Sequence, residues 1–265
     1  MFAVRRDGAE ARRFEDCVVV EEPLEVRLDG RTVTTTMRTP GADFELAAGF
    51  LWGEGALTGE RVVDVRYCEL GDAFESGFNV VSVTTSGGEA RARPRLTATT
   101  AACGVCGSEA VDELCARLLP LLAPVPALDG AVATAVGEAL RDAQPLFATT
   151  GAVHAAAAFD VASGELVVVR EDIGRHNAVD KVVGHLLLDG RLPADLEHPG
   201  GLGLFVSGRA SFEMAQKAWA ASFRWLLAVG GPSSLAVDVA RRANLGLAAF
   251  VRGTAMTVYS PEDRP

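Results

Sequence analysis

The sequence predicts an α/β protein with a mixed, mostly parallel sheet covered by helices, preceded by an N-terminal α+β subdomain. In the second half of the chain, β-prone runs alternate with helical patterns, which is typical of a parallel sheet with helices on its faces. The first hundred residues instead hold several β-prone runs and one helical pattern. With 265 residues, of which 49% are hydrophobic, the chain can bury a large core.

The N-terminal subdomain is expected to open with a hairpin. Asp29 and Gly30 separate two β-prone runs, 17–28 and 31–37, and Asp-Gly favours a tight turn between antiparallel strands. A helix is expected to begin near Asp43, where apolar residues recur at helical spacing. Three further strands complete this subdomain, at 62–67, 78–85 and 90–96.

In the second half, two predicted helices, 108–122 and 132–141, lead to a hairpin of 153–159 and 165–170. Strands are then predicted at 202–207, 225–229 and 247–252, and helices at 177–188, 211–224 and 234–244. We therefore divide the chain into an N-terminal subdomain, 1–97, a segment with a Cys-x-x-Cys loop and its following helix, 98–128, and an α/β subdomain, 129–265.

Charge and hydropathy exclude several classes of protein. The formal net charge is −10, which repels nucleic acid at long range. The sequence has no apolar run of the roughly 18 residues that a membrane helix needs, and its charged N-terminus lacks the apolar core of a signal peptide. We therefore expect a cytoplasmic protein that binds neither nucleic acid nor membrane.

Two of the five cysteines form the sharpest chemical signal, Cys103-Gly-Val-Cys106. Ser108 is a candidate helix N-cap just after them, and the positive end of a helix dipole favours thiolate, the nucleophilic form of cysteine. Such a thiolate can accept the outer sulfur of a persulfide, and its neighbour can release it. A structural zinc site is the weaker alternative, because no second pair of ligands has suitable spacing.

Polar residues gather where three predicted strands end. The segment 170–181 is rich in charge, and 207–217 carries hydroxyls and a guanidinium just before a helix. The third strand, 247–252, offers an aromatic ring and another guanidinium. Ligands of open α/β sheets bind at such carboxyl ends, where helix N-termini can hold phosphate. The alternative is a set of capped helices with solvated ion pairs.

These segments belong to seven motifs that together resemble the formate dehydrogenase accessory sulfurtransferase family (FdhD/NarQ). The motifs stand in the family's order at 37–40, 45–55, 103–107, 147–157, 170–181, 207–217 and 232–237. One departure is the stretch 222–225, where relatives tend to have a Gly-Ile-Pro turn.

The resemblance implies a sulfurtransferase that takes sulfur from a cysteine desulfurase as a persulfide on Cys103, with Cys106 as helper. The sulfur would pass to the bis(molybdopterin guanine dinucleotide) molybdenum cofactor, bound as a client ligand, before insertion into formate dehydrogenase. A chaperone that binds this cofactor without donating sulfur is the alternative. A cytidine deaminase-like fold, a homodimer and the absence of a permanent metal are also implied.

The expected cofactor-binding residues come from all three strand ends. The resemblance places the guanine nucleotides near the third of these segments, and the first two supply groups for phosphate. The complete set is Arg175, His176, Asn177, Lys181, Ser207, Arg209, Ser211, Leu247, Ala248, Ala249, Phe250, Val251 and Arg252.

Overall fold

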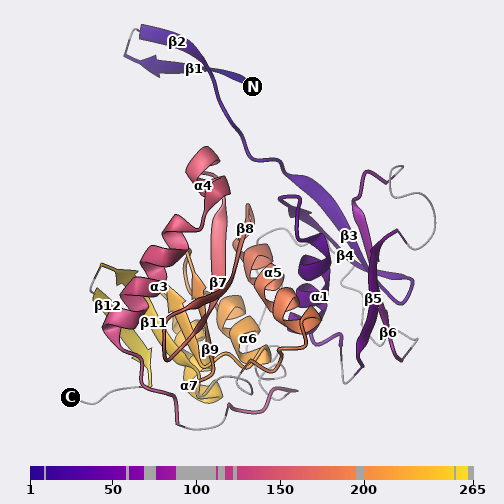
Figure 1. Ribbon diagram of the computed structural model, residues 1–265, viewed down its shortest axis with the longest axis vertical. Helices are drawn as coiled ribbons and strands as arrows, with labels where there is room; N and C mark the ends of the chain where they lie inside the picture. The colour runs from indigo at the N-terminus through magenta and orange to yellow at the C-terminus, as the bar shows by residue number, and fades with distance from the viewer. Residues whose placement is uncertain are drawn as a thin grey trace.

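The computed structural model describes residues 1–8, 10–57, 60–68, 76–87, 112, 117–121, 124–194, 200–253 and 255–261. Cys103 and Cys106, the predicted strand 90–96 and most of the predicted helix 108–122 lie outside the described residues. Figure 1 shows a small sheet beside a larger one, and a hairpin that extends away from both.

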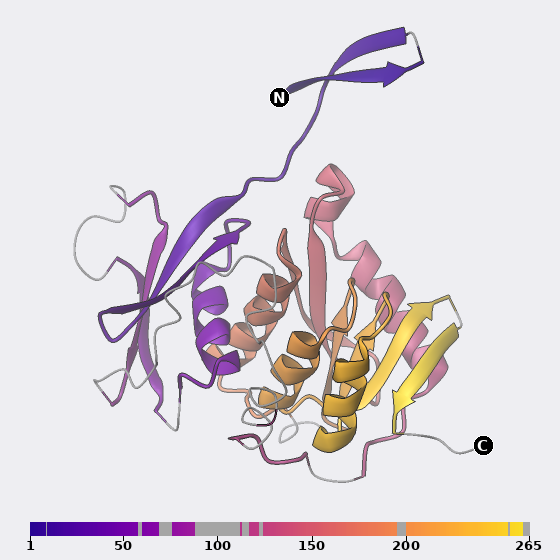
Figure 2. The ribbon, with the colours of Figure 1, turned by 180° about the vertical axis from the view of Figure 1, so that it is seen from behind.

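The extended hairpin consists of β1 (Phe2–Asp7) and β2 (Glu10–Glu15), which pair antiparallel. Nearly all of its residues are exposed, so its sequence lacks the alternation of a half-buried strand, and the sequence analysis missed it. Arginine side chains lie over its aromatic rings, with Arg13 4.2 Å from the ring centroid of Phe2. Both ribbon views place the hairpin apart from the two sheets (Figures 1 and 2).

The small sheet has the order β4-β3-β6-β5. Its first hairpin is confirmed, with Asp29 and Gly30 between the strands and inward-facing Leu24, Val26 and Leu28. These side chains pack on the helix that follows, which begins at Asp43, although Ala42 and not Asp43 is its N-cap residue. The elements are β3 (Glu22–Leu28), β4 (Arg31–Arg38), α1 (Asp43–Gly53), β5 (Val62–Tyr67) and β6 (Val80–Thr85).

The large sheet has six strands in the order β12-β11-β10-β9-β7-β8. They are β7 (His154–Asp160), β8 (Leu166–Asp172), β9 (Leu202–Val206), β10 (Trp225–Ala228), β11 (Gly246–Arg252) and β12 (Ala255–Ser260). Strands β9, β10 and β11 are parallel, whereas β7 is antiparallel to β8 and β9, and β12 is antiparallel to β11. The predicted mixed sheet is confirmed, and β8 to β11 all point the same way, so their carboxyl ends lie at one edge.

Helices cover both faces of this sheet. Alternate residues of β7 serve the two layers, because Ala155 and Phe159 join the core under α3 while Ala156 joins the core under the other helices. The helices are α3 (Gly130–Asp142), α4 (Pro145–Thr150), α5 (Arg175–Leu188), α6 (Phe212–Ala220) and α7 (Ser234–Ala243). No helix in the described part of the chain is long and apolar enough to cross a membrane.

Helix α6 ends earlier than predicted. It was expected to reach residue 224, but it stops at Ala220, and Ser222 has a φ of 60°. Such a left-handed residue breaks the helix, and the Arg224 N–H then donates to the carbonyl of Leu202. The departure at 222–225 is therefore the turn from α6 into β10.

The two sheets are joined through a close crossing of α1 and α5. A Cβ atom added to Gly49 would lie 1.9 Å from the carbonyl oxygen of Asp180, and one added to Gly184 would lie 1.8 Å from that of Glu45. An ion pair also joins α1 to β8 of the large sheet, since Glu45 accepts hydrogen bonds of 2.5 and 2.6 Å from Arg170. The small sheet is therefore fixed against the large one.

Candidate functional site

The carboxyl edge of the large sheet brings together many of the predicted ligand-binding residues. Helices α5 and α6 begin just beyond β8 and β9, and α7 begins beyond β10. Strand β7 runs the opposite way, so its first residue, His154, lies at the same edge. We call this cluster the strand-end site, and it comprises His154, Arg175, His176, Arg209, Ser211, Glu213 and Phe250.

Three glycines in the turns after β9 and β10 lie against these side chains, and the two after β10 allow a close approach to the backbone. A Cβ atom on Gly208 would contact Arg175 and His154, each at 3.7 Å. A Cβ atom on Gly230 would lie 2.9 Å from Arg209, and one on Gly231 would lie 2.8 Å from the ring of Phe250. The side chains therefore form a continuous row along the edge, from His154 to Phe250.

The cationic part of the site holds polar atoms without a protein partner. The Nε atom of Arg175 and the Oγ atom of Ser211 are both buried, and neither makes a hydrogen bond within the protein. Buried polar groups normally have a partner, so such atoms are candidates for ligand contact. Burial, aided by Arg175 and His176, lowers the pKa of His154 below its ordinary value.

The N-termini of α5 and α6 both lie at the strand-end site. The N-cap residues of α5 and α6 are Gly174 and Ser211, and neither gives its helix a side-chain cap bond. By contrast, Ser233 caps α7 by accepting a hydrogen bond from the N–H of Ala236. Uncapped N–H groups and the helix dipole favour anions, so the edge between α5 and α6 is suited to phosphate.

Glu213 connects these two helices. Its Oε2 atom lies 2.5 Å from the buried Nε2 atom of His176. The contact becomes an ion pair when His176 is protonated. The contact with His176 lowers the pKa of Glu213, against the opposing effect of burial.

The two predicted ligand-binding residues in the middle of the α5 segment, Asn177 and Lys181, lie inside the protein. Lys181 is 2% exposed, and its Nζ atom lies 2.7 Å from Asp172 and donates to the carbonyl of Thr39. Asn177 is also buried, and its side-chain amide donates to Asp172 and to the carbonyl of Met37. Both side chains therefore connect the turn after β4 to the start of α5.

The segment 247–252 divides between core and surface. Leu247, Ala248, Ala249 and Val251 are at most 5% exposed and belong to the two cores of the large sheet. Phe250 is 46% exposed at a β-bulge and has a φ of 55°. Such a φ is strained for a residue with a side chain, and strain of this kind clusters at functional sites. Arg252 is exposed at the end of β11.

Ser207 belongs to the frame of the site. Its Oγ atom accepts a hydrogen bond from the N–H of Ala155, and its own N–H donates to the Ala155 carbonyl. The serine thus continues the pairing of β9 with β7 beyond the end of the strand.

His154 and Glu213 were missed as site residues by the sequence analysis. Both stand inside motifs quoted for the family resemblance, which was the available signal. Their position follows from pairing that the sequence does not show, because β7 is antiparallel to β9 and α6 lies beside α5.

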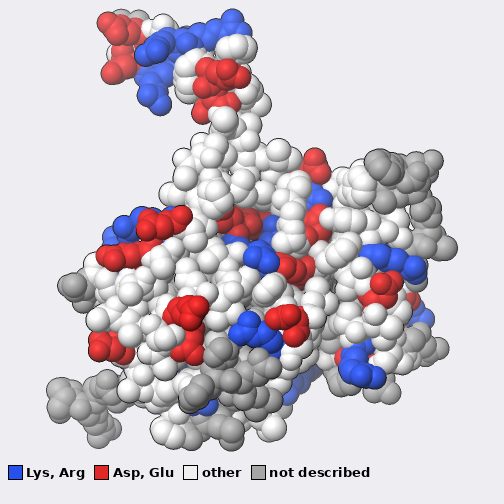
Figure 3. All heavy atoms as spheres, viewed as in Figure 1, with Lys and Arg blue, Asp and Glu red and all other residues white. Residues whose placement is uncertain are grey.

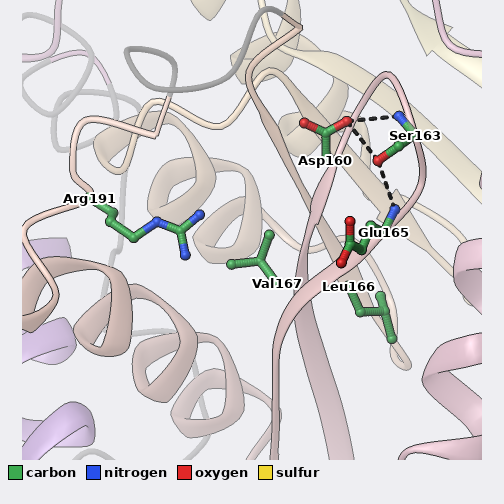
Figure 4. Close-up of a pocket in the computed structure, with 6 residues that line it drawn as sticks. All are labelled: Asp160, Ser163, Glu165, Leu166, Val167 and Arg191. Atoms are coloured by element: carbon green, nitrogen blue, oxygen red, sulfur yellow. Dashed lines mark hydrogen bonds between the residues drawn. The ribbon is translucent and has the colours of Figure 1, made fainter.

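A hollow of about 390 Å³ lies at the opposite edge of the sheet, where β7 turns into β8. Figure 4 shows its lining residues, Asp160, Ser163, Glu165, Leu166, Val167 and Arg191. Asp160 accepts hydrogen bonds from the N–H and the hydroxyl of Ser163. These polar groups therefore stabilise the turn, and the hollow is separate from the strand-end site.

Charge at the surface is mixed in sign. Figure 3 shows acidic and basic side chains interspersed on the face in view, without an extended basic area. Within the described ranges, no group of three or more His, Cys, Asp or Glu side chains is arranged to hold a metal ion.

The fold and the site define a mixed α/β protein whose sheet edge carries cationic side chains and open helix N-termini. The model of the FdhD/NarQ family matches residues 19–265. The chain therefore belongs to the FdhD/NarQ family.

Individual relatives agree with this assignment. The sulfur carrier protein FdhD of Mycolicibacterium paratuberculosis is 45% identical over 94% of this chain and 92% of its own. That of Streptomyces avermitilis is 46% identical over 98% of this chain and 92% of its own. Among solved structures, a candidate formate dehydrogenase accessory protein from Desulfotalea psychrophila superposes with a TM-score of 0.74 at 25% identity, covering 99% of this chain and 96% of that one.

Proposed function

We propose that this chain is a sulfur carrier that takes sulfur from a cysteine desulfurase as a persulfide on Cys103. It passes that sulfur to the bis(molybdopterin guanine dinucleotide) molybdenum cofactor before the cofactor enters formate dehydrogenase. Family membership supports the sulfur-carrier role, because relatives of 45 and 46% identity that span nearly the whole chain are named sulfur carrier proteins. The cytoplasmic location and the homodimer stay predictions.

The strand-end site is the observation on which the choice of substrate rests. A guanine nucleotide has phosphates and a flat base, and this edge offers groups for both. Arg175, Ser211 and the open N-termini of α5 and α6 suit the phosphates. The exposed ring of Phe250 suits stacking on the base. Arg209 and Arg252 are exposed nearby and can pair with further phosphate oxygens.

The buried members of the predicted set have another role in this proposal. Lys181, Asn177 and Ser207 already hold protein partners, and Leu247 to Ala249 and Val251 are core. We propose that they shape the edge, and that Arg175, His176, Arg209, Ser211, Phe250 and Arg252 contact the ligand.

The sulfur transfer needs two displacements at sulfur. The Cys103 thiolate attacks the outer sulfur of the donor persulfide, a new S–S bond forms, and the donor cysteine leaves as a thiolate. The Cys106 thiolate then attacks the Cys103 sulfur and expels the outer sulfur as sulfide with its electron pair. This leaves a Cys103–Cys106 disulfide, which a thiol reductant reopens.

Intact mass spectrometry tests the carrier role directly. After incubation with a cysteine desulfurase and cysteine, the unsubstituted protein should gain the mass of one sulfur atom, and Cys103→Ala should not. Cys17→Ala is the matched control, because Cys17 is an exposed cysteine outside the loop. An unchanged gain in Cys103→Ala would remove Cys103 from this role.

The chaperone alternative predicts a different result in cells. If the protein only shields the cofactor, the double variant Cys103→Ala/Cys106→Ala should still support formate dehydrogenase maturation. Under the sulfur-carrier proposal, maturation should be lost while GDP, a probe for the nucleotide part of the cofactor, still binds to the strand-end site.

A further inference from the structure

Four titratable side chains lie across α5 and α6 in two contacting pairs, and we call these four residues the ring. His176 and Asp180 are four residues apart on α5, and Glu213 and Lys217 are four residues apart on α6. Residues at this spacing lie on the same face of a helix. The His176–Glu213 and Lys217–Asp180 contacts are both 2.5 Å. Charges of opposite sign therefore alternate around the ring when His176 is protonated.

The ring extends from the strand-end site into the protein interior. Lys217 and Asp180 are both at least 95% buried, next to Gly53 at the end of α1. Burial raises the pKa of Asp180 to about 6, although Lys217 opposes this shift. Burial lowers the pKa of Lys217, but Asp180, Glu54 and Glu213 outweigh it and leave that pKa raised.

Glu213 lies among positive groups. His176 contributes most to lowering the pKa of Glu213, and Lys217 and Arg175 add to this effect. From the other side, Arg175 on α5 and His154 on β7 approach the same region. A carboxylate attracts imidazolium far more strongly than neutral imidazole, so the contact between Glu213 and His176 is strongest when the His176 imidazole carries a proton.

We propose that Glu213 is a positioning residue that holds His176 in place at the strand-end site, where the imidazole binds an anionic group of the ligand. The inference rests on the proposed function for the identity of that ligand. Glu213 acts through His176, and the buried Lys217–Asp180 pair fixes the two helices between which the contact forms.

A positioning role and a direct electrostatic role of Glu213 predict opposite changes in ligand affinity. A carboxylate near a phosphate repels it, so Glu213→Gln should strengthen binding if Glu213 acts only by its own charge. If Glu213 acts through His176, Glu213→Gln should weaken binding about tenfold, the effect of losing one charge-assisted contact. His176→Gln should weaken binding to a similar degree.

Calorimetric titration with GDP on four full-length proteins tests this: the unsubstituted chain, Glu213→Gln, His176→Gln and the double variant. The double variant should bind as weakly as His176→Gln alone. Once the His176 imidazole is removed, Glu213 has nothing to position, so its loss should add no further effect. Equal or tighter binding by Glu213→Gln would overturn the proposal.

Two controls complete the experiment. Glu165→Gln, in the hollow at the opposite edge, should leave the affinity unchanged. Glu213→Asp, which keeps the charge, should retain more affinity than Glu213→Gln, and it covers the case in which Glu213→Gln does not fold.

The experiment separates an error in the proposed ligand from an error in the proposed role of Glu213. If the unsubstituted chain binds no GDP, the proposed ligand is wrong. Thermal unfolding of the same four proteins needs no ligand and decides whether Glu213 and His176 act as a pair. Non-additive effects on stability support the inference, and additive effects overturn it.

Discussion

Lys181 and Asp172 form an ion pair in the interior, with side chains that are 2% and 0% exposed. Removing two charges from water costs several kcal/mol, which the pair repays only if its other polar positions are satisfied. Here Asp172 accepts further hydrogen bonds from the N–H groups of Thr39 and Gly174. The pair therefore joins the turn after β4 to the start of α5.

Lys181→Met should destabilise the protein by about 3–5 kcal/mol, because it leaves the Asp172 carboxylate buried without its counter-charge. Urea unfolding measures this loss. Arg66→Met is the control, because Arg66 and Asp64 are about half exposed and such pairs contribute about 1 kcal/mol or less. The GDP affinity of the folded Lys181→Met protein should stay near that of the unsubstituted chain. A large loss of affinity without a loss of stability would show that Lys181 contacts the ligand.

The motif 170–181 could be recognised from the sequence as a functional segment, but its members have different roles. Arg170 binds Glu45, and the Glu171 carboxylate accepts from the N–H groups of Leu146 and Phe147 at the start of α4. Only Arg175 and His176 are left at the strand-end site. Residue type does not reveal this division, because the partners are distant in sequence.

Helices α1 and α5 cross where Gly49 meets Gly184, and their backbones touch. The helical pattern of each segment was visible in the sequence, but the crossing was not. Glycine weakens an isolated helix by about 1 kcal/mol relative to alanine. Its presence in both helices is explained by the contact between them.

Gly184→Ala should therefore destabilise the protein, by about 1–3 kcal/mol, even though alanine favours a helix, because the added methyl would push α1 away. Gly130→Ala is the matched control: Gly130 is also a helical glycine, but a Cβ atom there lies 3.9 Å from its nearest neighbour, Met256. Chemical denaturation of both variants provides the comparison. Equal stability of the two would contradict the close crossing.

The elements that the sequence analysis missed depend on partners for their stability. β12 has only one buried residue, Ser260, and is held by pairing with β11. Helix α4 has no buried residue, and its first N–H groups are satisfied by Glu171. Predicted elements with an amphipathic or fully buried pattern, such as β9 and α7, were found because burial leaves a signature in the sequence.

The β1–β2 hairpin stands apart from the rest of the molecule (Figures 1 and 2), and the family match begins after it, at residue 19. Deletion of residues 1–16 should change stability by no more than about 0.5 kcal/mol, or about 1–2 °C in Tm. Differential scanning calorimetry measures the shift, and GDP titration checks that the strand-end site is intact. A loss of several degrees would show that the hairpin packs on the body.

Cations are unevenly divided between the interior and the surface. The chain has only two lysines, Lys181 and Lys217, and both are buried in ion pairs. Every exposed side-chain cation in the described regions, histidine aside, is therefore an arginine. Because arginine presents a planar fork that matches phosphate oxygens, the cations left at the strand-end site are the type best suited to a nucleotide.

The sequence by itself determined the fold class, the family and the segments that are candidates for the site. These follow from local patterns of burial and from motifs that can be read along the chain. The tertiary structure decided which members of those motifs lie at the sheet edge and which hold the two sheets together. That division depends on strand direction and on the α1–α5 crossing, which bring residues more than a hundred positions apart into contact, such as Thr39 with Lys181.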